Sequence, residues 1–296
     1  MQFAEPTYYL ETNALRGLGK KILRLEPSRK YRTSVLSLLE LISSASSSER
    51  DFSICKGCLG NLLTLKFEVD FAFPEKKIAD TFEFFKHIEK RQGDLQEVIK
   101  GILQASDLAS CKELLGTKNL TYGMEHFREY DENFGRQFIE ASIAGCREIK
   151  KAFESKESHG GAVFEASELA LPFREFCKVF ATKYSELNRS ASVWAFSTQL
   201  STWLDENPTE ELVGKVYQSY NGNLDRFIDA FSYYTMIQAG KMNQPGRNDF
   251  LDLFHFSYVE QGDIFVTDDK DILSICHDLN LCSTQSPASL PLIASG

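Results

Sequence analysis

Two stretches near opposite ends of the chain place carboxylates where they could act together. The first, "YYLETN", runs from a β-favouring segment straight into Glu11. The second, "DIFVTDD", runs from a similar segment through Thr267 into Asp268 and Asp269. In open parallel α/β sheets, sites form just beyond the carboxyl ends of the strands. If these two strands are neighbours, their acids converge at one edge of the sheet.

Three further carboxylates could join this group. Glu40 lies within the apolar face of a helix predicted over residues 33–46, where an unsatisfied carboxylate is costly. Asp249 and Asp252 are spaced i, i+3 at the start of another predicted helix, so they share a face. Several carboxylates within a few ångströms either take up protons or hold a cation. Oxygen ligands suit Mg²⁺ or Mn²⁺, which activate water and clamp phosphoryl oxygens in nuclease-type hydrolysis.

Each acid also has a structural explanation. Asp249 could cap its own helix, and Asp268 or Asp269 could cap the helix that follows. His255, one turn after Asp252, is better explained by packing or hydrogen bonding than by metal ligation. The set of acids, taken together and in this order along the chain, favours a metal site over a series of unrelated caps.

The elements that must position these acids are predicted to differ between the ends and the middle of the chain. Strand and helix patterns alternate at both ends, with Asn13 placed to cap a helix over 13–25, whereas the middle has helical periodicity almost throughout. The expected fold class is α/β, with a parallel-sheet core of residues 1–64 and 241–296. Residues 65–240 form a large, mostly helical insertion in this scheme, and the tail from residue 284 is expected to be frayed.

A basic segment follows the first strand. The 296-residue chain has a net charge of −9, so its overall field does not steer it toward nucleic acid, and RNA binding would need a local basic patch. Residues 16–32 supply such a patch, beginning with Arg16, Lys20, Lys21 and Arg24. A backbone phosphate could therefore reach both the patch and the strand-end acid. The alternative explanation of these charges is a solvated helix face.

Cysteine usage and hydropathy predict the compartment. Seven scattered Cys favour a reducing environment, and the close pair Cys55 and Cys58 lacks the second pair that a zinc site would need. Neither a signal peptide nor an apolar run long enough to cross a membrane is seen. The expected location is cytoplasmic, with no membrane association.

The order of the acids resembles that of PIN-domain proteins, the nuclease family of bacterial toxin ribonucleases and RNA-processing endonucleases. That family typically begins with a strand ending in Asp-Thr-Asn, matched here by "YYLETN", and carries a Glu-Leu pair in its second helix, matched by "LLEL" at Glu40. Its third acid opens a late helix, matched by "NDFLDLFH", and its fourth lies two residues beyond a strand-final Thr, matched by Asp269. The resemblance covers residues 7–60 and 245–285.

The resemblance implies a ligand set for Mg²⁺ or Mn²⁺. Glu11, Glu40, Asp249 and Asp269 would hold the metal. Asn13 and Thr267 would orient the carboxylates or the attacking water, with Asp252 and Asp268 as supports or substitutes. The chain departs from the family at its first acid, because Glu11 stands where Asp is usual. The extra methylene moves the carboxylate outward, which could shift the metal or disable catalysis.

The expected function is therefore a metal-dependent endoribonuclease that hydrolyses RNA phosphodiesters by in-line attack of water. One alternative is a catalytically inactive PIN-like scaffold that binds RNA or protein. Another is a helical interaction protein whose acids are only helix caps. The insertion is expected to shape substrate choice or to bind a protein partner, and a homo-oligomer remains open.

Overall fold

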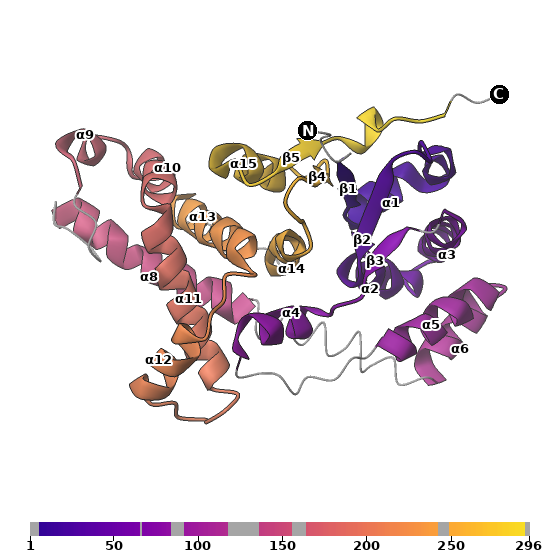
Figure 1. Ribbon diagram of the computed structural model, residues 1–296, viewed down its shortest axis with the longest axis horizontal. Coiled ribbons are helices and arrows are strands. Elements are labelled where there is room, and N and C mark those ends of the chain that lie inside the picture. Colours follow the sequence, from indigo (N-terminus) through magenta and orange to yellow (C-terminus); the bar gives the residue numbers. More distant parts are fainter. Residues whose placement is uncertain are drawn as a thin grey trace, which may run out of the picture. The chain divides into compact units, whose positions relative to one another are not determined.

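The computed structural model describes residues 6–65, 67–83, 92–117, 136–155, 164–241 and 249–293. The chain divides into two compact units (Figure 1). Unit 1 comprises Met1–Lys76, Glu89–Glu129 and Tyr258–Gly296, and unit 2 comprises Lys77–Ile88 and Tyr130–Ser257.

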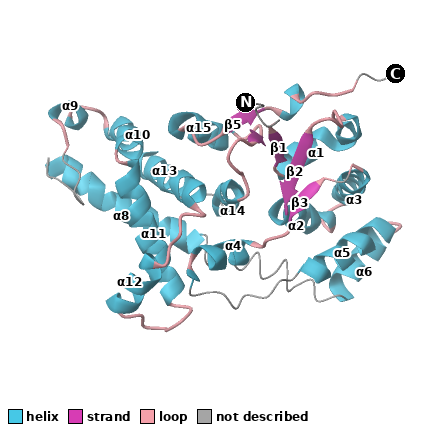
Figure 2. Ribbon diagram, viewed as in Figure 1, coloured by secondary structure: helices cyan, strands magenta, loops and turns pink. Residues whose placement is uncertain are grey.

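Unit 1 is built on a five-stranded sheet in the order β3-β2-β1-β4-β5, and every neighbouring pair is parallel (Figure 2). The strands are β1 (Thr7–Leu10), β2 (Lys30–Ser34), β3 (Glu68–Asp70), β4 (Ile264–Val266) and β5 (Ser283–Gln285). The prediction that both ends of the chain contribute to one parallel sheet is confirmed. Figure 2 also shows that helix predominates elsewhere in the described chain.

The central strands are short apolar runs, as expected of parallel strands covered on both faces. Tyr9 and Leu10 in β1 are fully buried, as are Phe265 and Val266 in β4. Tyr9 pairs in register with Phe265, and their rings meet edge to face with centroids 5.4 Å apart. Cross-strand contacts of this kind hold β1 and β4 together although more than 250 residues separate them in sequence.

The helical elements of unit 1 are α1 (Thr12–Leu18), η1 (Gly19–Arg24), α2 (Val35–Ala45), α3 (Glu49–Thr64), α5 (Gln92–Gln104), α6 (Leu108–Thr117), α15 (Lys270–Leu279) and η5 (Pro287–Ser289). The helix predicted over 13–25 begins one residue earlier and stops after Leu18, because Gly19 adopts a positive φ of 48° and the chain continues as a 3₁₀ helix. Its N-cap is Glu11, so the assignment of Asn13 as the cap is wrong.

Two expectations about unit 1 are corrected. β3 pairs with β2, and the Lys56 ammonium donates to the Ala105 carbonyl at 2.6 Å, so α5 packs beside α3. The boundary expected at residue 64 therefore falls inside unit 1, and the boundary expected at residue 241 falls inside unit 2.

The tail is the second correction, because it is paired rather than frayed as far as Ile293. Leu25 and Leu292 form an antiparallel bridge, and the Ile293 amide donates to the Arg24 carbonyl at 2.7 Å. The Arg24 guanidinium also donates to the Ile293 carbonyl, at 3.0 and 3.2 Å. These bonds satisfy main-chain groups that a free tail would leave to water.

Unit 2 is helical in the residues described, as expected for the middle of the chain. Its helical elements are α8 (Arg136–Ser155), α9 (Ala166–Leu169), α10 (Phe173–Lys183), α11 (Ser185–Ser201), α12 (Glu210–Gln218), α13 (Asp225–Lys241), α14 (Asp249–Phe254) and η4 (His255–Ser257). Helix α4 (Pro74–Thr81) contains the point at which the chain passes from unit 1 to unit 2.

Aromatic rings form the core of unit 2. The Phe227 ring lies 5.6 Å from Phe196, 5.6 Å from Phe250 and 4.7 Å from Phe254, centroid to centroid, and all four side chains are fully buried. The rings come from α11, α13 and α14, so this cluster fixes α14 against the longer helices.

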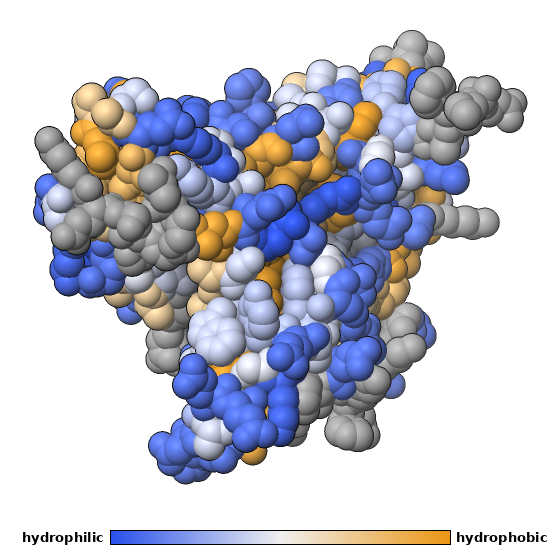
Figure 3. Space-filling view, turned by 60° about the vertical axis from the view of Figure 1, so that its left-hand side comes forward, coloured by the Kyte–Doolittle hydropathy of each residue, from blue (hydrophilic) through white to orange (hydrophobic). Residues whose placement is uncertain are grey.

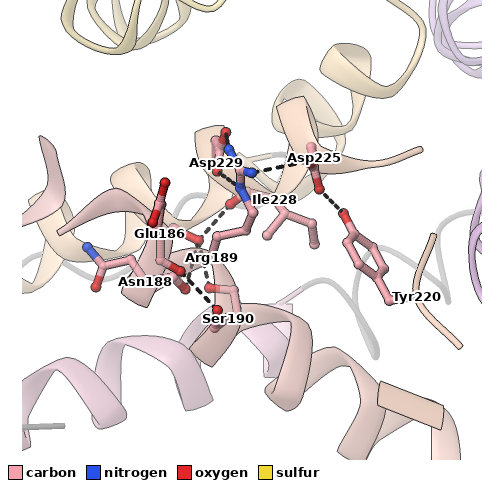
Figure 4. Close-up of polar contacts among 10 residues, drawn as sticks. Glu186, Asn188, Arg189, Ser190, Tyr220, Asp225, Ile228 and Asp229 are labelled. Atoms are coloured by element: carbon pink, nitrogen blue, oxygen red, sulfur yellow. Dashed lines mark hydrogen bonds and ion pairs between the residues drawn. The ribbon is translucent and has the colours of Figure 1, made fainter. Parts of the chain in front are cut away.

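An ion-pair network also joins α11 to α13 (Figure 4). The Arg189 guanidinium donates to both carboxylate oxygens of Asp229, at 2.7 and 2.5 Å, and to Asp225 at 3.1 Å. The Tyr220 hydroxyl donates to the other oxygen of Asp225 at 2.7 Å. A bidentate arginine–carboxylate pair of this geometry gives the packing of the two helices a defined register.

On the face drawn in Figure 3, hydrophilic residues predominate and hydrophobic ones gather in separate patches. Among the residues described, the large hydrophobic side chains classed as exposed are Leu23, Leu63, Trp194, Trp203, Leu204 and Ile293. Within the described ranges, no helix is both long enough and apolar enough to cross a membrane.

Candidate functional site

The carboxyl ends of β1 and β4 lie side by side at the centre of the sheet of unit 1. The strand order runs from β1 to β2 and β3 in one direction, and to β4 and β5 in the other. The direction of winding therefore reverses between β1 and β4, which is where open α/β sheets form ligand sites. Leu10 pairs with Val266, so Glu11 and Thr267 are the next residues on two neighbouring strands.

Glu11 is held in place by the start of α1. Its carboxylate accepts hydrogen bonds from the Asn13 amide at 2.6 Å and from the Ala14 amide at 3.2 Å, and its residue is only 3% exposed. The partial positive charge at the start of α1 also attracts the negatively charged Glu11 carboxylate. The side chain of Asn13 is exposed, so in this structure the residue orients Glu11 through its backbone amide.

Glu40 of α2 is held beside the same helix start. The Thr12 hydroxyl donates to the Glu40 carboxylate. The Arg16 guanidinium donates to the Glu40 carbonyl at 3.1 Å and to the Ser44 hydroxyl at 2.7 Å, which anchors α1 to α2. The acid in an apolar helix face, which the sequence singles out as costly, therefore accepts a hydrogen bond from the hydroxyl of Thr12, the first residue of α1.

Tyr9 is a polar member of this cluster that the sequence analysis overlooks. Its hydroxyl shares a hydrogen bond of 2.8 Å with Ser34, the N-cap of α2. Burial raises the pKa of the Tyr9 phenol above its ordinary value, and the charges of Glu40 and Glu11 raise it further. The phenol is therefore a neutral group beside two carboxylates. The position of Tyr9 in the strand, two residues before Glu11, is a sequence signal that could have identified it.

Asp269 lies three residues beyond the end of β4 and is the N-cap of α15, as Glu11 is the N-cap of α1. Its carboxylate caps α15 by accepting from the Asp271 amide at 2.9 Å and the Ile272 amide at 3.0 Å, both through Oδ1. The hydroxyl oxygen of the fully buried Thr267 accepts from the Asp269 amide at 2.9 Å. Thr267 thus fixes the backbone of the acid, while the neighbouring Asp268 is exposed.

Asp249 and Asp252 belong to unit 2. Both lie in the first turn of α14, which confirms that they start a helix, although α14 is only six residues long. The Tyr234 hydroxyl of α13 donates to the Asp249 carboxylate. His255 is buried in η4 and is in accord with the packing role expected of it.

The oxygen chemistry of Glu11, Glu40 and Asp269 fits Mg²⁺ or Mn²⁺. Each carboxylate offers about four acceptor positions, and the capping bonds of Glu11 and Asp269 use two on each residue. Carboxylate oxygens are also the ligand atoms that a hard cation prefers. In the part of the chain that the structure describes, however, no group of three or more His, Cys, Asp or Glu side chains is placed so that it could hold one metal ion.

The four basic residues expected to bind RNA have different surroundings. Arg16 is bonded to α2, and Arg24 is bonded to the tail, so both guanidinium groups already serve the fold. Lys20 and Lys21 lie exposed in η1. These two lysines are the better candidates for contact with a phosphate backbone.

Comparisons of the chain with protein-family models, with curated proteins and with solved structures gave no match.

Proposed function

We propose that the chain is a metal-dependent endoribonuclease of the PIN type, with a helical insertion between the two parts of its α/β core. The observation that carries the proposal is the placement of Glu11 and Asp269 after β1 and β4, two adjacent parallel strands at the switch point of the sheet. The hydroxyl of Thr12, the residue that follows Glu11, donates to the Glu40 carboxylate. Asp249 enters the proposal from the family resemblance alone.

The residues of unit 1 have separate roles in this proposal. Glu11, Glu40 and Asp269 supply oxygen ligands, and a bound Mg²⁺ or Mn²⁺ would provide a Lewis acid and an activated water for hydrolysis. The capping bonds hold Glu11 and Asp269 in fixed orientations before any ligand arrives. The exposed Lys20 and Lys21 hold the RNA backbone by charge.

A second candidate is a catalytically inactive scaffold that binds RNA or protein. The observation in its favour is that Glu11 and Asp269 each cap a helix, which gives both acids a structural role without a metal. The two candidates differ in their response to added Mn²⁺. Binding of the metal to ligating carboxylates stabilises the folded state, whereas carboxylates that only cap helices give no metal-dependent stabilisation.

The test is cleavage of mixed single-stranded and structured RNA by purified protein with Mg²⁺ or Mn²⁺. We expect metal-dependent cleavage that falls by about 100-fold or more in Asp269→Asn. Asn caps helices nearly as well as Asp, so this variant should remain folded. We expect a similar loss in Asp249→Asn. Asp271→Asn is the matched control, because Asp271 is exposed in the first turn of the same helix and should tolerate the change.

Thermal melting with and without Mn²⁺ completes the test. A metal-dependent rise in the melting temperature of the wild type that is absent in Asp269→Asn supports the site. Failure of the wild type both to cleave RNA and to be stabilised by metal would reject the nuclease and favour the scaffold.

A further inference from the structure

Two cysteines meet at the far end of α15 from Asp269. Cys276 lies in the last turn of α15, and Cys282 directly precedes β5. Their Sγ atoms are 3.5 Å apart. Asn280 ends the helix in the left-handed region, with φ 51° and ψ 42°, and the Leu281 amide donates to the Cys276 carbonyl at 3.3 Å. This helix end turns the chain back and brings the two thiols together.

Cys276 and Cys282 differ in accessibility. Cys276 is 3% exposed, whereas Cys282 is partly open to solvent in the short connection before β5. The thiols of Cys55 and Cys58, in contrast, are both buried inside α3. An oxidant dissolved in the solvent can therefore reach Cys282 directly. The buried Cys276 thiol lies next to it and can act as the resolving thiol.

We propose that Cys276 and Cys282 form a redox-active dithiol that closes to a reversible disulfide when the protein meets hydrogen peroxide. The Cys282 thiolate attacks one peroxide oxygen, the O–O bond breaks, and a sulfenic acid and hydroxide result. The Cys276 sulfur then attacks the Cys282 sulfur, the S–O bond breaks, and the hydroxyl group leaves as water with the proton of the Cys276 thiol. Two thiols are oxidised and one peroxide is reduced to two waters.

The geometry needs only a local adjustment to close the bond. A disulfide has an S–S distance of about 2.05 Å, so the sulfurs must approach by roughly 1.5 Å from their separation of 3.5 Å. Cys282 lies outside both α15 and β5, so the connection can supply this movement without breaking the ladder of β4 and β5. The disulfide would join the last turn of α15 to the residue that directly precedes the edge strand β5.

The wild-type full chain tests this inference directly. Fully reduced protein is treated with an equimolar amount of hydrogen peroxide, alkylated, digested with trypsin and analysed by mass spectrometry. The fragment that follows Lys270 contains Cys276 and Cys282 and none of the other cysteines. We expect this fragment to lack two hydrogens and to carry no alkyl group, and dithiothreitol treatment before alkylation should restore two alkylation sites.

Two variants act as controls. Cys276→Ser should leave Cys282 open to alkylation or to further oxidation, with no internal bridge. Cys55→Ser removes a buried thiol elsewhere in unit 1 and should leave the bridge unchanged. A wild-type fragment that carries two alkyl groups after peroxide, that contains sulfinic acid, or that is linked to another chain would overturn the proposal, and this result does not depend on the folding of any variant.

Discussion

At the scale of single residues, the candidate acids have an observed structural role, helix capping, and a proposed chemical one, metal binding. The Glu11 carboxylate accepts hydrogen bonds from two backbone amides. The Asp269 carboxylate also accepts two, both through the same oxygen. Capping needs an acceptor atom, whereas metal binding needs a negative charge as well. Substitutions that keep the acceptor and remove the charge therefore separate the two roles.

Glu11→Gln is such a substitution, and Glu11→Asp is its counterpart. We expect Glu11→Gln to reduce RNA cleavage by about 100-fold, because the ligand charge is lost. The free energy of unfolding should fall by no more than about 1–2 kcal/mol, because the amide oxygen can still cap α1. Glu11→Asp restores the residue usual in PIN domains and should retain cleavage. Cleavage assays and urea unfolding measure both effects.

Glu49→Gln is the matched control for Glu11, since Glu49 is an exposed acid in the first turn of α3. It should change neither cleavage nor stability appreciably. If Glu11→Gln cleaves RNA as well as the wild type does, Glu11 is only a helix cap.

Cys55 gives a pH-dependent prediction for the core of unit 1. Burial raises the pKa of the Cys55 thiol to about 12, from an ordinary value near 9. Below pH 9 the thiol is neutral in both the folded and the unfolded chain, so its contribution is fully present. Between pH 9 and pH 12 the unfolded chain loses this proton first, so the contribution is lost as pH rises.

Urea unfolding at a series of pH values from 8 to 10.5 measures this effect. The free energy of unfolding of the wild type should fall more steeply with pH than that of Cys55→Ala, by up to about 1 kcal/mol per pH unit. The other titratable groups are the same in both proteins, so the difference between the two slopes reports the ionisation of Cys55. Parallel slopes for the two proteins would show that Cys55 ionises normally in the fold.

At the scale of elements, a buried ion pair joins β2 to the turn before β4. The Arg32 guanidinium pairs with Asp263 and Glu260, and it donates to the Tyr258 carbonyl at 3.1 Å. Asp263 in turn accepts from the Glu260 amide at 2.7 Å. Arg32 and Asp263 are 5% and 6% exposed, so the turn into β4 is fixed by charges out of contact with water.

Asp263→Asn should destabilise unit 1 by about 3–5 kcal/mol, because it leaves the Arg32 charge buried without its main partner. Glu260→Gln is the matched change on the other partner. The Glu260 side chain is 72% exposed, so its removal should cost less than about 1 kcal/mol. Urea unfolding compares the two variants. Equal losses would mean that the pair with Asp263 is no more important than a surface contact.

At the scale of the whole molecule, charge decides how RNA could be held. A chain of net charge −9 gains no general attraction to RNA, so affinity must come from a local site. Arg16 and Arg24 are used in packing, which leaves the exposed Lys20 and Lys21 as the main local charges of the proposed patch.

We expect the double variant Lys20→Glu, Lys21→Glu to bind RNA at least about 10-fold more weakly than the wild type. Its affinity should also depend less on salt, with a slope of log K against log salt smaller by about 1.4 if both lysines contact phosphates of a single strand. Fluorescence anisotropy at several salt concentrations measures both quantities.

Arg174→Glu, Lys178→Glu on α10 is the control for overall charge, because both residues are exposed and the double change alters the net charge equally. Equal weakening in the two double variants would show that RNA responds to the total charge of the protein and not to the patch.

The local sequence alone determined the kinds of elements and the candidate acids. Apolar runs predict β1 and β4, periodicity predicts the helices of the middle, and the residues after each strand identify Glu11 and Asp269. These features depend on neighbours a few residues away, so they can be inferred without the fold. Local patterns misplace the helix over 13–25, because the positive φ of Gly19 decides where α1 ends.

Only the tertiary structure decided which distant segments meet. The neighbouring positions of β1 and β4 follow from the pairing of the whole sheet, and no local pattern specifies that β3 joins it or that the tail pairs with Leu25. The contact of Thr12 with Glu40, the buried pair of Arg32 and Asp263, and the meeting of Cys276 with Cys282 depend likewise on packing or on the path of the chain. Such contacts form only when burial of the core compensates the entropy that is lost when distant segments are brought together. They therefore depend on the complete fold and cannot be inferred from the residues nearby in sequence.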